Sequence, residues 1–311
     1  MSVFLSAAIF RSLPLIIFCC IFFFQNNCNQ GKGHSNSSTH NGNVSTENSN
    51  SQKPEAKNLS LFCPAGNAFY VLFYSNPLNK PEGKRIRDLR PNFVITADTL
   101  YKNPEVPSFF HRDAEALTNI RAISYITVAG GEEDLKGLLK KIDDSMNAGY
   151  DGVFFDVVED ESSEEKQINY YGEISKKVKS FGKDKLVIFN PGEKHVEAWV
   201  FDYADIVSVE NNGIEGGLFD QPHTTNPEKK YPDWRWLSIM GDPSKYAAKN
   251  VEEANQRLKS FRNNGGLWFY SPPYCEASPQ VCPDNSSHYH LPDWLEKFAA
   301  EAKKENVKCS Q

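Results

Sequence analysis

The chain has 311 residues, a formal net charge of −6, and 40% hydrophobic and 13% aromatic residues. This length is enough for one large or two small domains with a sizeable core. A negative net charge is not typical of proteins that bind nucleic acid or anionic membrane surfaces, which argues against those two partners. It suits a neutral or cationic substrate.

An apolar segment near the first residue predicts export across a membrane. Arg11 is the only early positive charge, and Leu13–Phe24 is an unbroken apolar run with the length of a secretory h-region. Residues 1–25 are therefore expected to be a signal peptide that is cleaved, or an N-terminal anchor that is retained. Either alternative places the rest of the chain outside the cytoplasm.

Residues 26–61 have the composition of a disordered linker. Asn, Ser, Gly, Thr and Lys dominate, almost nothing apolar is available for burial, and no periodicity is present. Four N-x-Ser/Thr sequons are candidate glycan sites, at Asn36, Asn43, Asn58 and Asn285. The folded part is expected to span residues 62–309.

Apolar runs alternate with amphipathic, charged segments through the folded part. The runs predict strands at Ala68–Tyr74, Asn92–Ala97, Arg121–Val128, Gly152–Asp156, Lys185–Asn190, Asp205–Glu210, Arg235–Met240 and Gly266–Tyr270. The intervening segments predict helices up to Arg90 and at Pro107–Asn119, Glu132–Ala148, Gln167–Phe181, Glu193–Val200, Val251–Asn263 and Leu291–Glu305, with Gly149 as a left-handed helix end.

Eight strand-like runs that alternate with helices over roughly 240 residues match the count and length of a single (β/α)8 barrel. An open, doubly wound sheet is the alternative, but that fold more often has a glycine-rich phosphate-binding turn after its first strand. Ser75-Asn76-Pro77 stands there instead. We therefore predict an α/β fold of the barrel type.

A barrel carries its chemistry at the carboxyl ends of its strands. The polar and aromatic residues at those ends are Tyr74, Asp98, Tyr125, Thr127, Asp156, Asn190, Glu210, Asp242 and Tyr270. Asp156 and Glu210 end the fourth and sixth strands, which lie close enough across a barrel mouth for two carboxylates to converge. Such a pair suits glycoside hydrolysis, in which one acid protonates the leaving oxygen and the other attacks or activates water.

The other strand-end residues are candidate substrate contacts. Asn190 is expected to bind a sugar hydroxyl or merely to form a turn, and Tyr270 is expected to stack on a sugar face at the mouth. Asp98 is a substrate contact or a solvated cap. Asp151 precedes its strand and is excluded, because residues at that face of a barrel serve stability.

The cysteines of the folded part are expected to form disulfides, as suits an exported protein. Four cysteines allow three pairings. We favour Cys275 with Cys282, which bracket a short loop, and Cys63 with Cys309, which would close the two ends of the domain. A zinc site is the alternative, but C-x2-C spacing and paired histidine ligands are missing, so no metal or cofactor is expected.

Three motifs, GYDGVFFD, VIFNPG and YADIVSVEN, at these separations resemble the spherulin-4-like proteins of glycoside hydrolase family 135. They are similar also to the related endo-α-1,4-polygalactosaminidase family 114. The resemblance covers about Phe69–Asn211. It implies a barrel that cleaves galactosamine-containing exopolysaccharide without a metal, with the strand-end acids at Asp156 and Glu210. Asp156 would be nucleophile or charge stabiliser and Glu210 the acid/base, or the reverse.

One position departs from the spherulin pattern, which has a second acid directly after the strand-end Asp, whereas this chain has Val157. Two hypotheses follow. The chain is a secreted or surface-anchored glycoside hydrolase with a polysaccharide substrate, or it is a non-catalytic barrel that binds glycan in a wall or coat.

Overall fold

The computed structural model describes residues 66–111, 120–131, 133–159, 162–192, 196–210, 231–239, 247–273, 289–304 and 306–307. All of them lie within a compact unit that spans Gln52–Gln311. The segment 1–25, the linker 26–61, the four sequons, Asp242 and the four cysteines of the predicted disulfides lie outside the described residues. Within the described ranges, no helix is both long and apolar enough to cross a bilayer.

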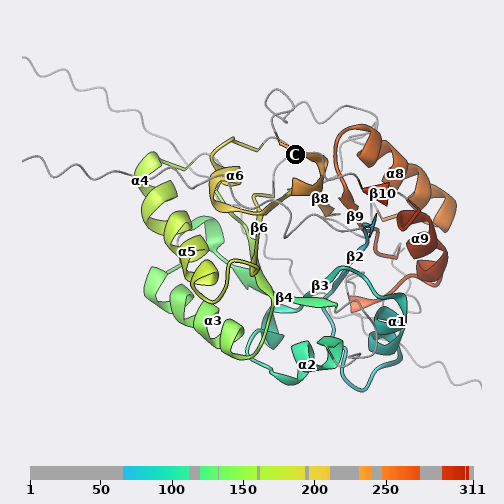
Figure 1. The fold of residues 1–311 in the computed structure, drawn as a ribbon, viewed down its shortest axis with the longest axis horizontal. Helices are drawn as coiled ribbons and strands as arrows, with labels where there is room; N and C mark the ends of the chain where they lie inside the picture. Colours follow the sequence, from blue (N-terminus) through green and yellow to red (C-terminus); the bar gives the residue numbers. More distant parts are fainter. Residues whose placement is uncertain are drawn as a thin grey trace, which may run out of the picture. The chain divides into compact units, whose positions relative to one another are not determined.

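The described residues contain an eight-stranded sheet in which every neighbouring pair is parallel and the spatial order follows the chain. Its strands are β2 (Tyr70–Phe73), β3 (Phe93–Thr96), β4 (Arg121–Thr127), β5 (Gly152–Asp156), β6 (Leu186–Asn190), β7 (Ile206–Glu210), β8 (Trp236–Ile239) and β9 (Trp268–Phe269). The predicted (β/α)8 barrel is confirmed, as a single, nearly closed sheet with helices outside it (Figure 1).

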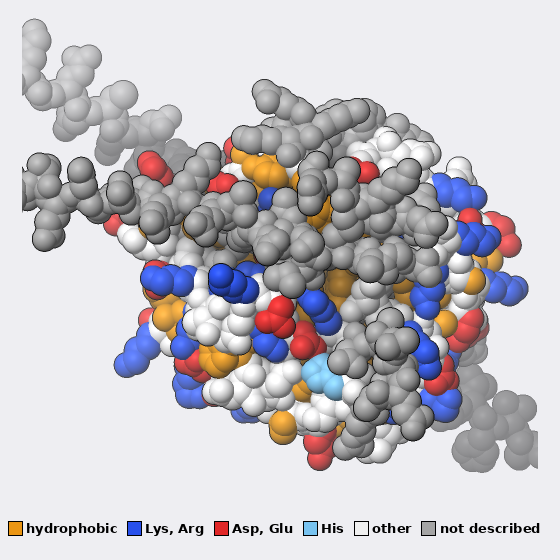
Figure 2. Space-filling view, viewed as in Figure 1, with side chains coloured by type: hydrophobic (Ala, Val, Ile, Leu, Met, Phe, Trp, Pro, Cys, Tyr) orange, Lys and Arg blue, Asp and Glu red, His pale blue; other side chains and the backbone are white. Residues whose placement is uncertain are grey.

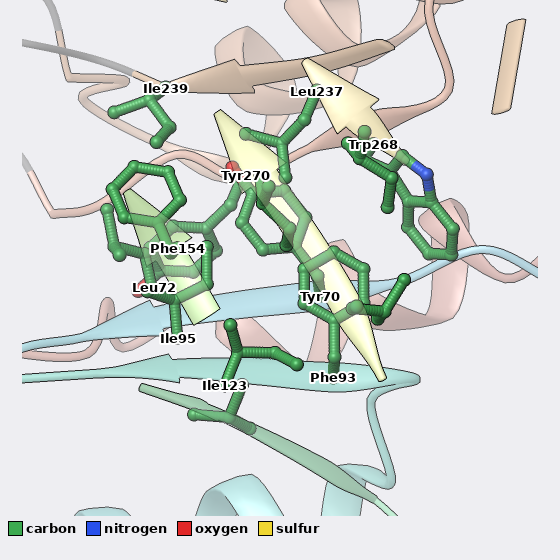
Figure 3. Close-up of a cluster of buried hydrophobic side chains, with 14 of the residues drawn as sticks. Tyr70, Leu72, Phe93, Ile95, Ile123, Phe154, Leu237, Ile239, Trp268 and Tyr270 are labelled. Atoms are coloured by element: carbon green, nitrogen blue, oxygen red, sulfur yellow. The ribbon is translucent and has the colours of Figure 1, made fainter. Parts of the chain in front are cut away.

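The strands are continuous apolar runs because both of their faces are buried, one inside the barrel and one under the helices. Figure 3 shows the inner face, where side chains from β2, β3, β4, β5, β8 and the end of β9 point toward one another. The inner group includes Tyr70, Phe93, Phe154 and Trp268, each at most 2% exposed. The interior is thus a packed core and not a channel.

Aromatic contacts bring the last strand back to the first. The rings of Tyr70 and Tyr270 lie 6.0 Å apart, and the Tyr70 hydroxyl donates to the Ser238 carbonyl of β8 at 2.6 Å. On the outer side, the ring of Phe298 lies 6.2 Å from that of Phe69 and 6.2 Å from that of Phe269. One helix therefore covers the seam of the barrel. A short antiparallel pair, β1 (Gly66–Asn67) with β10 (Asn306–Val307), joins the two ends of the folded part.

Helices follow the strands and surround them (Figure 1). Among the described residues these are α1 (Pro81–Leu89), α2 (Glu105–His111), α3 (Leu135–Asn147), α4 (Glu164–Lys166), α5 (Glu173–Ser180), α6 (Val200–Tyr203), α8 (Val251–Asn263) and α9 (Leu295–Ala302). A 3₁₀ turn, Asp98–Leu100, follows β3, and a π-helical segment, Gln167–Gly172, joins α4 to α5.

Side-chain caps fix two of the longest helices. Asp134 accepts a hydrogen bond from the Gly137 amide at 2.9 Å before α3, and Asn250 accepts one from the Glu253 amide at 2.9 Å before α8. After α3, Gly149 has φ +98°, which confirms the predicted left-handed helix end. The chain then enters β5 directly, so α3 and its ends set where that strand begins.

The prediction of a helix at Glu193–Val200 is wrong in its described part, because residues 196–199 are not helical and α6 begins at Val200; residues 193–195 lie outside the described residues. Tertiary contacts hold α6 where it lies. Tyr231 stacks on Phe201 with ring centroids 3.9 Å apart, and Arg235 donates to the carbonyls of Phe201 and Ala204. Arg235 thus satisfies carbonyls at the end of α6, a partner that local sequence does not reveal.

The predicted helix Gln167–Phe181 is present, but its first part is π-helical. Tyr170 and Tyr171 are adjacent, and both are buried. Neighbouring residues of an α-helix point about 100° apart, so a wider turn helps to bring both rings to the inner side.

On the face shown in Figure 2, lysine and arginine side chains are interspersed with acidic ones, in keeping with the small net charge.

Candidate active site

The register of three neighbouring strands aligns three predicted site residues. Asp156 of β5 pairs with Thr127 of β4 on one side and with Asn190 of β6 on the other. All three stand at the carboxyl ends of their strands, where parallel strands bring polar groups to one edge. The sheet therefore sets the spacing of this group through its backbone hydrogen bonds.

Two neutral donors hold the Asp156 carboxylate. The Tyr125 hydroxyl donates to Oδ2, and the Asn190 side-chain amide donates to Oδ1 at 2.6 Å. Asn190 is 2% exposed, whereas Asp156 is half-buried. The side-chain oxygen of Asn190 accepts from the Gly192 amide at 3.3 Å, which fixes the orientation of the Asn190 side chain. The two hydrogen bonds thus fix the orientation of the Asp156 carboxylate, which stays partly open to solvent.

The surroundings of Tyr125 keep its hydroxyl protonated. Burial raises the pKa of this phenol most, and the charge of Asp156 and the hydrogen bond to it raise it further. A hydrogen bond from Thr127 lowers the pKa, but to a smaller extent, and the charge of Asp98 adds a last increase. Tyr125 is therefore a permanent hydrogen-bond donor to Asp156 near neutral pH.

Tyr74 and Asp98 complete the group on the side of β2 and β3. The ring of Tyr74 meets that of Tyr125 edge to face at 5.2 Å. Asp98 is exposed at the start of the 3₁₀ turn after β3. The structure thus brings Tyr74, Asp98, Tyr125, Thr127 and Asn190 together around Asp156, although whether they bind substrate stays a prediction.

The placement of Tyr270 corrects the prediction that it stacks on a sugar face at the open mouth. Tyr270 is 1% exposed and lies in the interior cluster with Tyr70 and Phe154 (Figure 3). Its hydroxyl is buried without a hydrogen-bond partner among the described residues. The strand β9 ends at Phe269, and the barrel core takes up the next ring.

Glu210 is the last residue of β7 and is in register with Ile239 of β8. The backbone therefore reaches the same end of the barrel as Asp156, as the alternation of strands predicts. The position of the Glu210 carboxylate lies outside what the structure describes, so its pairing with Asp156 stays a prediction.

The backbone conformation after Asp156 is a feature that the sequence did not reveal. Val157 has φ +60°, a left-handed conformation that is rare for a β-branched residue, and its side chain is 48% exposed. The Gly130 amide donates to the Val157 carbonyl at 2.6 Å, and the Val158 amide donates to the Asn190 carbonyl at 3.0 Å. The turn after β4 and the last residue of β6 thus hold the backbone of Val157 and Val158 from both sides.

The carboxylate of Glu159, two residues further on, is engaged by its own loop. It forms an ion pair with Lys166, and the Ser162 hydroxyl donates to it at 3.2 Å. The hydrogen bond from Lys166 lowers the pKa of Glu159 most. Its role as a loop residue is therefore structural. In the described part of the chain, no three His, Cys, Asp or Glu side chains gather as metal ligands do.

The chain is similar to proteins of a known family. A model of spherulation-specific family 4 matches residues 76–270. The crystal structure of Aspergillus clavatus Sph3 in complex with GalNAc is similar, with a TM-score of 0.56, 14% identity, and coverage of 78% of this chain and 100% of that chain.

A putative deoxyribose-phosphate aldolase from Coccidioides immitis gives a TM-score of 0.43 at 10% identity, over 67% of this chain and 84% of that chain. No curated protein matches. At 14% identity the Sph3 structure shows the barrel fold alone. The family match extends across most of the strands and confirms the resemblance expected from the motifs. The chain belongs to spherulation-specific family 4.

Proposed function

We propose that this protein is a glycoside hydrolase, exported or anchored at the cell surface, that cleaves a galactosamine-containing polysaccharide. The observation that carries the proposal is the Asp156 carboxylate, which stands at the carboxyl end of β5 between two neutral donors, Tyr125 and Asn190. Family membership supports a glycan-active protein, and the GalNAc in the Sph3 structure supports a sugar of this class. The apolar segment Leu13–Phe24 supports export.

The hydrogen bonds of Asp156 support one division of roles between the two acids. Both oxygens of Asp156 accept hydrogen bonds, so this group is arranged as a carboxylate and not as a proton donor. It suits the partner that attacks or stabilises the positively charged anomeric carbon. Glu210, at the end of β7, is then the acid that gives its proton to the glycosidic oxygen as the carbon–oxygen bond breaks. Water then gives a proton to the same glutamate and attacks the anomeric carbon, and any bond between that carbon and Asp156 breaks.

The test is release of reducing ends from partially deacetylated galactosaminogalactan by the full-length protein. We expect release by the wild type and its loss in Asp156→Asn and in Glu210→Gln. Asp88→Asn is the matched control, because it makes the same change at a carboxylate of α1 that is 61% exposed and, among the described residues, is paired with Lys84 alone. Release that survives both substitutions would contradict the assignment of Asp156 and Glu210 as catalytic residues, but it would still support hydrolase activity.

Val157 favours one alternative, a barrel that binds glycan without cleaving it. An exposed valine occupies the position where the spherulin pattern has an acid next to Asp156. The same experiment separates the two functions. Retention of the polymer in a pull-down without any release of reducing ends would favour binding, and restoration of release in Val157→Asp would attribute the lost activity to that residue.

A further inference from the structure

Three tyrosines from distant parts of the chain form a continuous row that starts at Asp156. The Tyr125 hydroxyl donates to Asp156, and the Tyr125 ring meets that of Tyr74 at 5.2 Å with an interplanar angle of 76°. The Tyr74 ring in turn meets that of Tyr289 at 6.4 Å and 77°. The contacts link β4, the end of β2 and the segment before α9, so the barrel and not the local sequence assembles them.

Exposure increases along this row. Tyr125 and Tyr74 are half-buried, whereas Tyr289 is 43% exposed. Among the described residues, the exposed large hydrophobic side chains are Val157, Ile168, Phe181 and Tyr289. Two of these four, Val157 and Tyr289, lie beside Asp156 or are joined to it through the row. Exposed apolar side chains therefore stand next to Asp156 in the sequence, at Val157, and at the far end of the row that starts from Asp156, at Tyr289.

We propose that Tyr289 is a glycan-binding residue that stacks on the apolar face of a sugar unit outside the cleavage point. The inference rests on the proposed function and extends it from the reacting bond to the neighbouring part of the polymer. Aromatic rings offer large, rigid apolar faces, and their polar edges tolerate water, which suits contact with one face of a sugar ring. Tyr74 holds Tyr289 in place, and Tyr125 connects both to Asp156.

This arrangement makes a specific kinetic prediction, because a contact that binds the ground state and the transition state equally changes KM and leaves kcat unchanged. Tyr289→Ala is expected to raise KM for partially deacetylated galactosaminogalactan about 10-fold, with kcat unchanged, as loss of one aromatic contact implies. Tyr289→Phe keeps the ring and is expected to retain the wild-type KM. Cleavage of a reporter that carries a single N-acetylgalactosamine unit should be equal in all three proteins.

Phe181→Ala is the matched control, since it removes an exposed ring at the end of α5, and it should leave KM unchanged. A second readout is the affinity of each variant for the polymer and for free N-acetylgalactosamine, measured by calorimetry with Asp156→Asn as background. Tyr289→Ala should weaken binding of the polymer only.

The outcomes are separable from those of the proposed function. If the wild type binds the polymer without cleaving it, the hydrolase proposal fails, and weaker binding by Tyr289→Ala still supports the stacking role. Equal effects of Tyr289→Ala on polymer and monosaccharide, or unchanged KM and affinity for the polymer, would overturn the inference. So would a wild-type protein that neither cleaves nor binds the polymer.

Discussion

Strand β5 carries one aspartate just before its first residue, Asp151, and another as its last residue, Asp156. Asp151 accepts a hydrogen bond from the Ala122 amide at 2.9 Å and lies 2.6 Å from His111 Nε2 and 3.6 Å from Lys185 Nζ. Asp156 has only neutral donors, Tyr125 and Asn190, among the described residues. The aspartate at the amino end of the strand thus has basic partners, whereas the aspartate at the carboxyl end has neutral ones.

The same contrast recurs at β7. Asp205, just before this strand, has a side chain that is 1% exposed, pairs with Lys179 at 2.5 Å and accepts from the Val187 amide at 2.8 Å. Aspartates at the amino ends therefore connect a helix, the backbone of the neighbouring strand and a basic side chain. A carboxylate whose charge is balanced by a basic side chain stabilises the fold. A carboxylate held by neutral donors has no such balancing charge, so its negative charge can act on a ligand.

The largest effect that tests this comparison is expected in activity. Asp156→Asn should reduce kcat about 10³-fold, or about 4 kcal/mol of barrier, with little change in Tm, because it removes the charge that the proposed reaction needs. Asp151→Asn should keep most of the activity and reduce stability by about 1–3 kcal/mol. Kinetics and thermal unfolding of both variants provide the measurement, and a reversed pattern would contradict the division between the two ends.

At the amino end, Asp205→Asn should reduce the free energy of unfolding by about 3 kcal/mol, because it leaves the ammonium of Lys179 without its buried counter-charge. Asp143→Asn is the matched control, since its pair with Lys177 at 2.6 Å has side chains 38% and 30% exposed. The control should cost less than about 1 kcal/mol. Equal losses of stability in urea denaturation would show that burial does not distinguish these pairs.

At the mouth, Tyr125→Phe should lower kcat about 30-fold, which corresponds to the roughly 2 kcal/mol of a hydrogen bond to a charged group. Tyr150→Phe tests specificity, because the Tyr150 hydroxyl is also held, at 2.7 Å from the Leu100 carbonyl, but not at the carboxylate. We expect the control to lose stability and keep kcat. Parallel losses of kcat in the two variants would argue against a special role for Tyr125.

A smaller effect concerns the backbone after Asp156. Val157→Asn should raise the free energy of unfolding by about 1 kcal/mol, because Asn tolerates the left-handed conformation that a β-branched residue resists. Ile168→Asn replaces another exposed apolar side chain, 51% exposed, that lacks a positive φ. It should not stabilise the protein. Stabilisation by both substitutions would assign the gain to the removal of an exposed apolar side chain, and stabilisation by neither would contradict strain at Val157.

The smallest expected effect is the pH dependence from Glu159. Its pKa is lowered from the usual 4.5, first by the hydrogen bond from Lys166. Because the folded pKa is lower than the unfolded one, this contribution is complete above 4.5 and is lost as pH falls through the folded value. Lys166→Met should therefore reduce the acid-dependent fall of Tm. The two proteins should differ in the pH-dependent part of their free energy of unfolding by about 0.5 kcal/mol or less, since the carboxylate is 44% exposed. Lys136→Met on α3 should leave the pH profile unchanged.

Much of the fold could be predicted because it follows from local patterns. Unbroken apolar runs such as Val153-Phe154-Phe155 need cover on both faces, which only a parallel sheet under helices provides. Gly149 marks the end of α3 because a left-handed turn favours glycine. For the same reason the sequence alone located Asp156 and Asn190 at one edge and assigned Asp151 to the stabilising face.

The tertiary structure decided what depends on contacts between distant residues. Arg235 and Tyr231 contact α6 from another part of the chain, and hydrogen bonds to Gly130 and to Asn190 of β6 hold the backbone of Val157 and Val158. Tyr270 was predicted at the mouth, but the closing barrel buries it, whereas Tyr289 meets Tyr74 from 215 positions away along the chain. Residue type and strand position determine which groups reach an end of the barrel, and packing determines which of them remain open to a ligand.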